Sequence, residues 1–150
     1  MALSLADTLA IQALNVEFAH RVDFGPQEST AELFVEDGWY AWRGKRSVGR
    51  GAIAAAYRSR TALGERTARH LCVNLRLAEI SSDEVAGHSI MLIFAENGRP
   101  PLPAVPLLVA DVDDTYIRLD GRWLFKSRRL TDVFADPSRT PVLPLADKDP

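Results

Sequence analysis

The stretch HLCVNLRLAEI, at residues 70–80, alternates polar and apolar side chains with a period of two. Such alternation predicts a long β-strand, because successive side chains of a strand point to opposite faces of its sheet. The residues before it follow a helical spacing, so the chain changes here from helices to strands. The predicted apolar face is Leu71, Val73, Leu75 and Leu77, and the opposite face is His70, Cys72, Asn74 and Arg76.

The second half of the chain predicts more strands joined by short turns. Asp120 and Gly121 are a strong two-residue hairpin signal. The segment at 96–103 is rich in proline, which has no N–H for a sheet ladder, so it is expected to be a loop. The further strands are expected at residues 85–94, 107–119 and 123–130.

The first half of the chain predicts helices. Apolar residues from Ile11 to Val22 recur at steps of three and four, which is typical of one buried helical stripe, and Gly25-Pro26 ends that helix. Two shorter helices, at 27–35 and 52–61, would flank an aromatic strand at 39–42. Helices followed by long antiparallel strands predict an α+β domain with the helices on one face of a curved sheet, and a pocket between the two.

Composition limits the function classes. The chain has 150 residues, of which 47% are hydrophobic and 25% charged, as in one folded domain. A net charge of −2 argues against nucleic-acid binding, and no apolar run reaches the roughly 20 residues of a membrane helix. The single cysteine fits a reducing compartment, and the N-terminus lacks the pattern of a signal peptide, so a cytoplasmic protein is expected. We expect the domain at 1–135 and a proline-rich tail at 136–150.

Chemistry without a cofactor or a metal is what the remaining polar residues favour. The sequence has no glycine-rich nucleotide loop and no Cys/His spacing typical of a metal site. Asp23 lies at the end of the first predicted helix, where it could serve as a general base or be only an exposed turn aspartate. His70 opens the first long strand, where it could act on a ligand or be a core histidine with a backbone partner.

Other candidates are weaker. His20 could face Asp23 or the solvent, and no partner is evident for His88. In the strand at 107–119, alternation places Asp114 on the face opposite Asp111 and Asp113. A salt bridge from Asp114 to an arginine such as Arg76 is preferred over an unpaired carboxylate in the pocket. The residues expected to line a binding pocket are Tyr40, Trp42, Asn74, Val112, Asp114 and Tyr116.

Five segments together resemble the SnoaL-like branch of the nuclear transport factor 2-like superfamily. They are FAHRVD (18–23), AELFVEDG (31–38), GRGAI (49–53), RHLCVN (69–74) and DGRWLF (120–125). The resemblance implies a cone-shaped α+β barrel around a pocket. It does not by itself imply one reaction, because this fold carries dehydratases, isomerases, cyclases, epoxide hydrolases and non-catalytic subunits.

Within that superfamily, the site pattern is most similar to scytalone dehydratase. The resemblance implies that Asp23 and His70 are a catalytic pair and that Trp42 stands near the position of a pocket tyrosine. Ala95 stands near the position of a second histidine, and Ala110 and Val112 stand where the family pattern has polar groups. A small, apolar, aromatic or polyketide-like substrate is therefore expected.

Three functions stay open from the sequence. The first is a dehydratase, and the second an isomerase or cyclase with the same base. The third is a non-catalytic ligand binder or accessory subunit of a ring-hydroxylating oxygenase. A homo-oligomer, dimer or trimer, is also expected, because the face that begins at Leu71 has more apolar surface than one helical layer covers.

Overall fold

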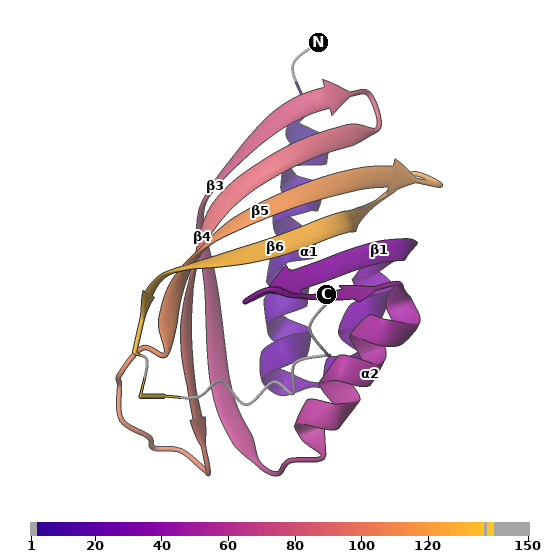
Figure 1. The fold of residues 1–150 in the computed structure, drawn as a ribbon. Helices are drawn as coiled ribbons and strands as arrows, with labels where there is room; N and C mark the ends of the chain where they lie inside the picture. The colour runs from indigo at the N-terminus through magenta and orange to yellow at the C-terminus, as the bar shows by residue number, and fades with distance from the viewer. Residues whose placement is uncertain (1–2, 137, 140–150) are drawn as a thin grey trace.

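The computed structural model describes residues 3–136, 138 and 139, so most of the predicted tail at 136–150 lies outside the described residues (Figure 1). Three helices and six strands follow one another along this part of the chain. The helices are α1 (Leu5–Phe24), the 3₁₀ helix η1 (Gln27–Leu33) and α2 (Arg50–Thr61). The strands are β1 (Phe34–Trp42), β2 (Lys45–Val48), β3 (Arg66–Ser81), β4 (Glu84–Asn97), β5 (Leu108–Leu119) and β6 (Arg122–Ala135).

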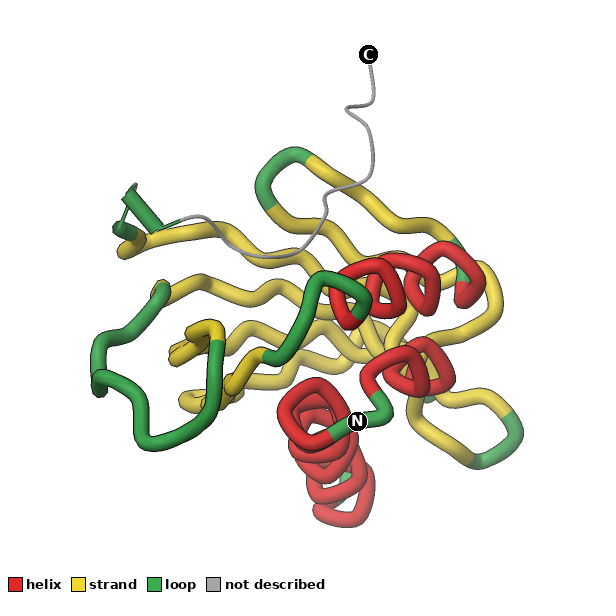
Figure 2. Tube along the Cα trace, turned by 90° about the horizontal axis from the view of Figure 1, so that it is seen from below, coloured by secondary structure: helices red, strands yellow, loops and turns green. Residues whose placement is uncertain are grey.

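The six strands form one mixed, curved sheet in the order β2-β1-β6-β5-β4-β3. Strands β1 and β6 run parallel, and all other neighbours are antiparallel. The sheet does not close, and the helices lie within its concave side, with α1 running along the strands' inner face and α2 across the open end (Figures 1 and 2). The predicted α+β fold with a curved sheet is confirmed, and helices rather than a closed ladder complete the cone.

Helix α1 follows its sequence signals closely. The Ser4 hydroxyl accepts from the Asp7 backbone N–H at 3.0 Å, which caps the first turn. Gly25 ends the helix with a φ of 76°, a conformation that glycine adopts without steric cost. The predicted stripe is buried, and Asn15 is buried beside it. Asp23 therefore lies in the last turn of the helix, as expected.

Strand β3 departs from strict alternation. Its register with β4 shifts between Val73 and Arg76, and Asn74 has a left-handed φ of 57°, the features of a β-bulge. One extra residue reverses the faces, so Leu75 and Leu77 pack on the core, whereas Leu71 and Val73 stay 42% exposed on the outer face. The expectation that these four side chains share one face is wrong for this reason.

Two clusters of buried side chains fill the space between the helices and the sheet. The first lies under α1 and includes Phe18, Phe34 and Phe125, whose rings contact one another with centroids 5.1–6.4 Å apart. The second lies under the other half of the sheet and includes Trp42, Met91 and several small or branched residues. Tyr40 contacts both clusters, so it marks the boundary at which a cavity opens.

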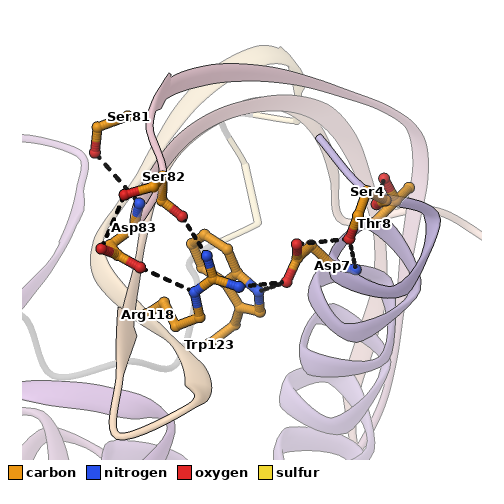
Figure 3. A network of polar contacts seen from close by, with 8 residues as sticks. All are labelled: Ser4, Asp7, Thr8, Ser81, Ser82, Asp83, Arg118 and Trp123. Atoms are coloured by element: carbon orange, nitrogen blue, oxygen red, sulfur yellow. Dashed lines mark hydrogen bonds and ion pairs between the residues drawn. The ribbon is translucent and has the colours of Figure 1, made fainter. Parts of the chain in front are cut away.

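A polar network fastens the start of α1 to two hairpin ends (Figure 3). Arg118 donates to Asp7 and to Asp83, each at 3.0 Å, and the Trp123 indole donates to Asp7 at 2.8 Å. Hydrogen bonds from Ser4 and Trp123 lower the pKa of Asp7, and those from Arg118 and Ser82 lower the pKa of Asp83. No helix in the described residues is both long and apolar enough to cross a membrane.

Candidate active site

Asp23 and His70, far apart in sequence, are brought together where the end of α1 meets β3. The Asp23 Oδ1 atom lies 2.6 Å from His70 Nδ1, and Asp23 Oδ2 accepts from the His70 backbone N–H at 2.8 Å. The two side chains are only 5% and 14% exposed. Both carboxylate oxygens therefore hold the same histidine, one through its ring and one through its backbone.

This arrangement selects one form of the imidazole. A carboxylate accepts hydrogen bonds, so the neutral ring carries its proton on Nδ1 and leaves the lone pair of Nε2 free. No described residue is hydrogen-bonded to Nε2, and His70 lines a cavity. The ring nitrogen that is free to act as a base is thus Nε2.

The cavity lies between α1, α2 and the inner face of the sheet. The cavity volume is about 50 Å³, and the empty space within its walls, open mouth included, is about 580 Å³. One water needs only about 10–15 Å³ by the first measure, so a small organic group fits. Aromatic and apolar side chains dominate the wall: Phe18, Val22, Tyr40, Trp42, Tyr57, Ala68, Met91, Ile93, Ala95, Leu107 and Leu130. The polar side chains of the wall are Gln27, Arg60, Arg66 and His70.

Two tyrosine hydroxyls also lie at this cavity. No described residue is hydrogen-bonded to the hydroxyl of Tyr40 or Tyr57, and neither hydroxyl oxygen is fully buried. Both hydroxyls are therefore accessible to a molecule in the cavity. Burial raises the pKa of Tyr40 and of Tyr57, so both stay protonated near neutral pH and can donate a hydrogen bond.

Sequence reasoning missed most of the wall residues, among them Tyr57, Arg60 and Arg66. Tyr57 and Arg60 share one face of α2 with Ile53, because residues at steps of three and four are neighbours on a helix. That spacing was the available signal. Arg66 precedes His70 by four residues on β3, so strand alternation places both on the inner face.

Four expected pocket residues lie outside the cavity wall. Asn74 is exposed at the bulge of β3, which turns it away from the inner face, so the expectation that it lines the pocket is wrong. Val112, Asp114 and Tyr116 do share one buried face of β5, as alternation predicted. They lie beneath the wall, in the core, and are not part of it. Tyr40 and Trp42 line the cavity as expected.

Asp114 forms a buried ion pair, but its partner is Arg128 and not Arg76. Arg128 donates from Nε to Asp114 Oδ1 at 2.9 Å and from Nη2 to Oδ2 at 2.8 Å, with both side chains at most 1% exposed. Tyr116 donates to the same carboxylate at 2.7 Å, and Asn15 bridges Tyr116 and Arg128. Burial alone would lower the pKa of Arg128, but the charge and hydrogen bonds of Asp114 raise it. This network is buried, and it joins α1 to strands β5 and β6.

The remaining histidines lie away from the cavity. His20 is exposed, and its ring lies against that of Phe24 at an angle of 35°. His88 has a partner after all, the exposed Asp113, at 2.9 Å on the outer face of the sheet. Within residues 3–136, 138 and 139, no three His, Cys, Asp or Glu side chains are close enough together to hold a metal ion.

Comparisons with known proteins identify the family and the fold. The SnoaL-like domain family matches residues 3–129. No curated protein matches the chain. Among solved structures, a candidate scytalone dehydratase from Novosphingobium aromaticivorans is 22% identical, with a TM-score of 0.77 and 97% of each chain covered.

Two other solved structures have the same fold. ActVI-ORFA from Streptomyces coelicolor is 20% identical, with a TM-score of 0.74, over 84% of this chain and 97% of that one. A Mycobacterium tuberculosis protein of unknown function is 24% identical, with a TM-score of 0.73, over 97% of this chain and 89% of that one. At these identities the likeness establishes the fold and leaves the reaction to be argued from the site.

Proposed function

This chain belongs to the SnoaL-like domain family, and from that premise we propose that it is a cofactor-free acid–base enzyme of the hydro-lyase type. The substrate class proposed is a small aromatic or polyketide-like molecule. The observation that carries the proposal is the contact between Asp23 and His70, 2.6 Å long, beside a cavity with aromatic walls. A histidine so held is a typical general base, and an apolar cavity with few polar groups is the usual form of a small-molecule site.

The proposed reaction removes water from a β-hydroxy ketone. His70 Nε2 takes a proton from the carbon next to the carbonyl, and the imidazolium that forms is stabilised by the Asp23 carboxylate. The electron pair of the broken C–H bond first moves toward the carbonyl oxygen to form an enolate, and it then forms the C=C bond as the C–O bond to the hydroxyl breaks. His70 returns the proton to the departing hydroxyl, which leaves as water, so the histidine ends in its starting form.

The carbonyl oxygen gains negative charge when the proton leaves, and a hydrogen-bond donor there lowers the barrier. Tyr40 and Tyr57 supply the accessible hydroxyl donors of the cavity wall. Because burial keeps them protonated, they can donate throughout the reaction without exchanging a proton. Isomerisation or cyclisation would use the same base and donors, with a different fate for the enolate.

Two compounds test the proposal. Proton abstraction is measured by NMR as the exchange of the α-hydrogens of 1-tetralone in D₂O, and dehydration as the formation of 1-naphthol from 3-hydroxy-1-tetralone. The proposal expects both reactions with the wild-type chain. Exchange without dehydration would favour an isomerase or cyclase, and neither reaction would favour a ligand binder or accessory subunit.

We also propose a homo-oligomer, dimer or trimer, formed through the outer face of the sheet. After the bulge in β3 only Leu71 and Val73 of the predicted four remain on that face, next to the partly exposed Ile90 and Leu92 of β4. Light scattering at micromolar concentration tests this proposal, and a monomer mass would contradict it.

A further inference from the structure

Two arginines in the cavity wall have no acidic partner in the described part of the chain. None of the ion pairs there includes Arg60 or Arg66. Arg60 is only 7% exposed. The other deeply buried arginine, Arg128, is held by Asp114 on two sides. Burying an arginine without such a partner costs folding free energy, unless a bound ligand supplies the opposite charge.

The guanidinium of Arg60 is open to the cavity. In the described residues, the fully buried side-chain atoms without a hydrogen-bond partner are Thr30 Oγ1 and Arg128 Nη1. The guanidinium nitrogens of Arg60 are not among them, so they keep some accessible surface. Arg60 and Arg66 both line the same cavity. Burial lowers the pKa of Arg60, and burial together with the charge of Arg60 lowers the pKa of Arg66 to about 10. Two cations that repel each other in one cavity wall form a site for an anion.

The nearby acidic group does not fill this site. Glu96 is the carboxylate that acts on Arg66, and it is held by Arg139 at 3.1 Å. Arg66 is four residues from His70 on the same face of β3, which at about 3.3 Å per residue separates their Cα atoms by about 13 Å. The arginine pair and His70 thus lie at different points along the cavity wall.

We infer that the substrate is an aromatic molecule with an anionic group, such as a carboxylate, held by Arg60 and Arg66 at the end opposite its reacting carbon. This inference rests on the proposed function, because it places the reacting carbon at His70. It changes the expected ligand from a purely apolar compound to an amphipathic acid. The apolar wall takes the rings, and the arginine pair fixes which end enters first.

The test compares two compounds that differ in charge and hardly in shape, 2-naphthoate and 2-naphthamide, by calorimetric titration at pH 7.5. The wild-type chain is expected to bind the acid at least about tenfold more tightly, since guanidinium–carboxylate bonds are stronger than neutral ones. Arg60→Gln and Arg66→Gln should each reduce this preference several-fold, and the double variant should bring it to about one. Affinity for the amide should not change. A third compound, 2-naphthyl phosphate, distinguishes a carboxylate from a phosphate as the preferred anion.

Arg58→Gln is the matched control, because Arg58 lies on the same helix and pairs with Glu28 at the surface. It should retain the wild-type preference. Arg66→Lys keeps the charge and should retain part of it, which provides a second readout if Arg60→Gln does not fold. Equal affinity of the wild type for acid and amide, no binding of either, or a preference that survives in the double variant would overturn the inference.

The binding test separates this inference from the proposed function. His70→Gln should abolish proton abstraction but leave the preference for the acid intact. If 1-tetralone does not exchange with the wild-type chain and the preference is nonetheless present, the anion site stands and the proposed reaction fails. The converse result would remove the anion site alone.

Discussion

Two histidine–aspartate pairs with similar Nδ1-to-carboxylate distances lie in opposite surroundings in this chain. His70 Nδ1 is 2.6 Å from Asp23, and His88 Nδ1 is 2.9 Å from Asp113. The side chains of the first pair are 14% and 5% exposed, and those of the second are 54% and 62% exposed. The first pair lies beside the cavity, and the second lies on the outer face of the sheet.

The difference shows that a pair of residue types does not make a site by itself. Asp23 also accepts from the His70 backbone N–H, so two hydrogen bonds hold this pair together. Asp113 and His88 share only one hydrogen bond in the described residues. His70 faces an aromatic cavity that limits water. An imidazole acts efficiently on a substrate carbon when its ring orientation is fixed and when the adjoining cavity excludes most water.

The largest effect is expected from breaking the inner pair. In Asp23→Asn the amide oxygen can still accept from the His70 backbone, so the NH₂ group faces Nδ1 and donates to it. The imidazole proton then moves to Nε2, which can no longer act as a base. We expect proton exchange of 1-tetralone to fall by roughly 10⁴-fold, as for other histidines held in the wrong tautomer.

The outer pair provides the control for this prediction. Asp113→Asn and His88→Gln make the same chemical changes on the outer face and should leave the exchange rate within about twofold of the wild type. Equal losses from the inner and outer substitutions would show that the exchange does not occur at the cavity.

A third carboxylate, that of Asp114, is buried but is expected to serve stability and not catalysis. Asp114 is more deeply buried than Asp23, but it is saturated by Arg128 and Tyr116 and does not line the cavity. Asp114→Asn leaves the Arg128 charge buried without its counter-charge. We expect a loss of about 3–5 kcal/mol in the free energy of unfolding. Urea unfolding followed by tryptophan fluorescence measures it, with Asp113→Asn expected within about 0.5 kcal/mol of the wild type.

Tyr57→Phe should give a smaller effect on rate. It removes the hydroxyl donor from the cavity and keeps the ring that packs in the core. We expect proton exchange to slow by about tenfold, the value of one hydrogen bond that is stronger in the transition state. A thermal unfolding midpoint close to the wild type would show that the fold is intact. An unchanged exchange rate would remove Tyr57 from the mechanism and leave Tyr40 as the donor.

Much of the fold was predictable from local patterns. The helix from Leu5 to Phe24 and the alternation of β5 follow from spacing alone, because each pattern is decided by neighbours in sequence. The bulge at Asn74 was not predictable, because one residue with a left-handed φ reverses a strand face without changing its composition. That single residue accounts for the error over Leu75 and Leu77.

The candidate site was predictable in part. Asp23 and His70 were recognised by resemblance, since neither the helix end nor the strand start predicts that the two residues meet. The Asp114–Arg128 pair was not recognised, because the run at 126–129 resembles an exposed basic stretch, and only the burial of β6 against α1 shows which arginine turns inward. Arg60 was missed because a basic residue in the last turn of a helix is usually exposed.

The smallest expected effect concerns the outer pair and pH. The hydrogen bond to the Asp113 carboxylate raises the pKa of His88 above the usual 6.5, although burial and Arg76 oppose it. A pKa raised by folding means that the pair stabilises the fold fully below about pH 6.5 and that this contribution is lost as the pH rises through the folded value. Because both side chains are more than half exposed, solvent screens the interaction and the change in stability should be slight. NMR titration of the His88 ring should give a midpoint above 6.5, and Asp113→Asn should lower it. A midpoint unchanged by Asp113→Asn would show that the outer contact does not persist in solution, which would leave the inner pair as the one whose geometry is held by its surroundings.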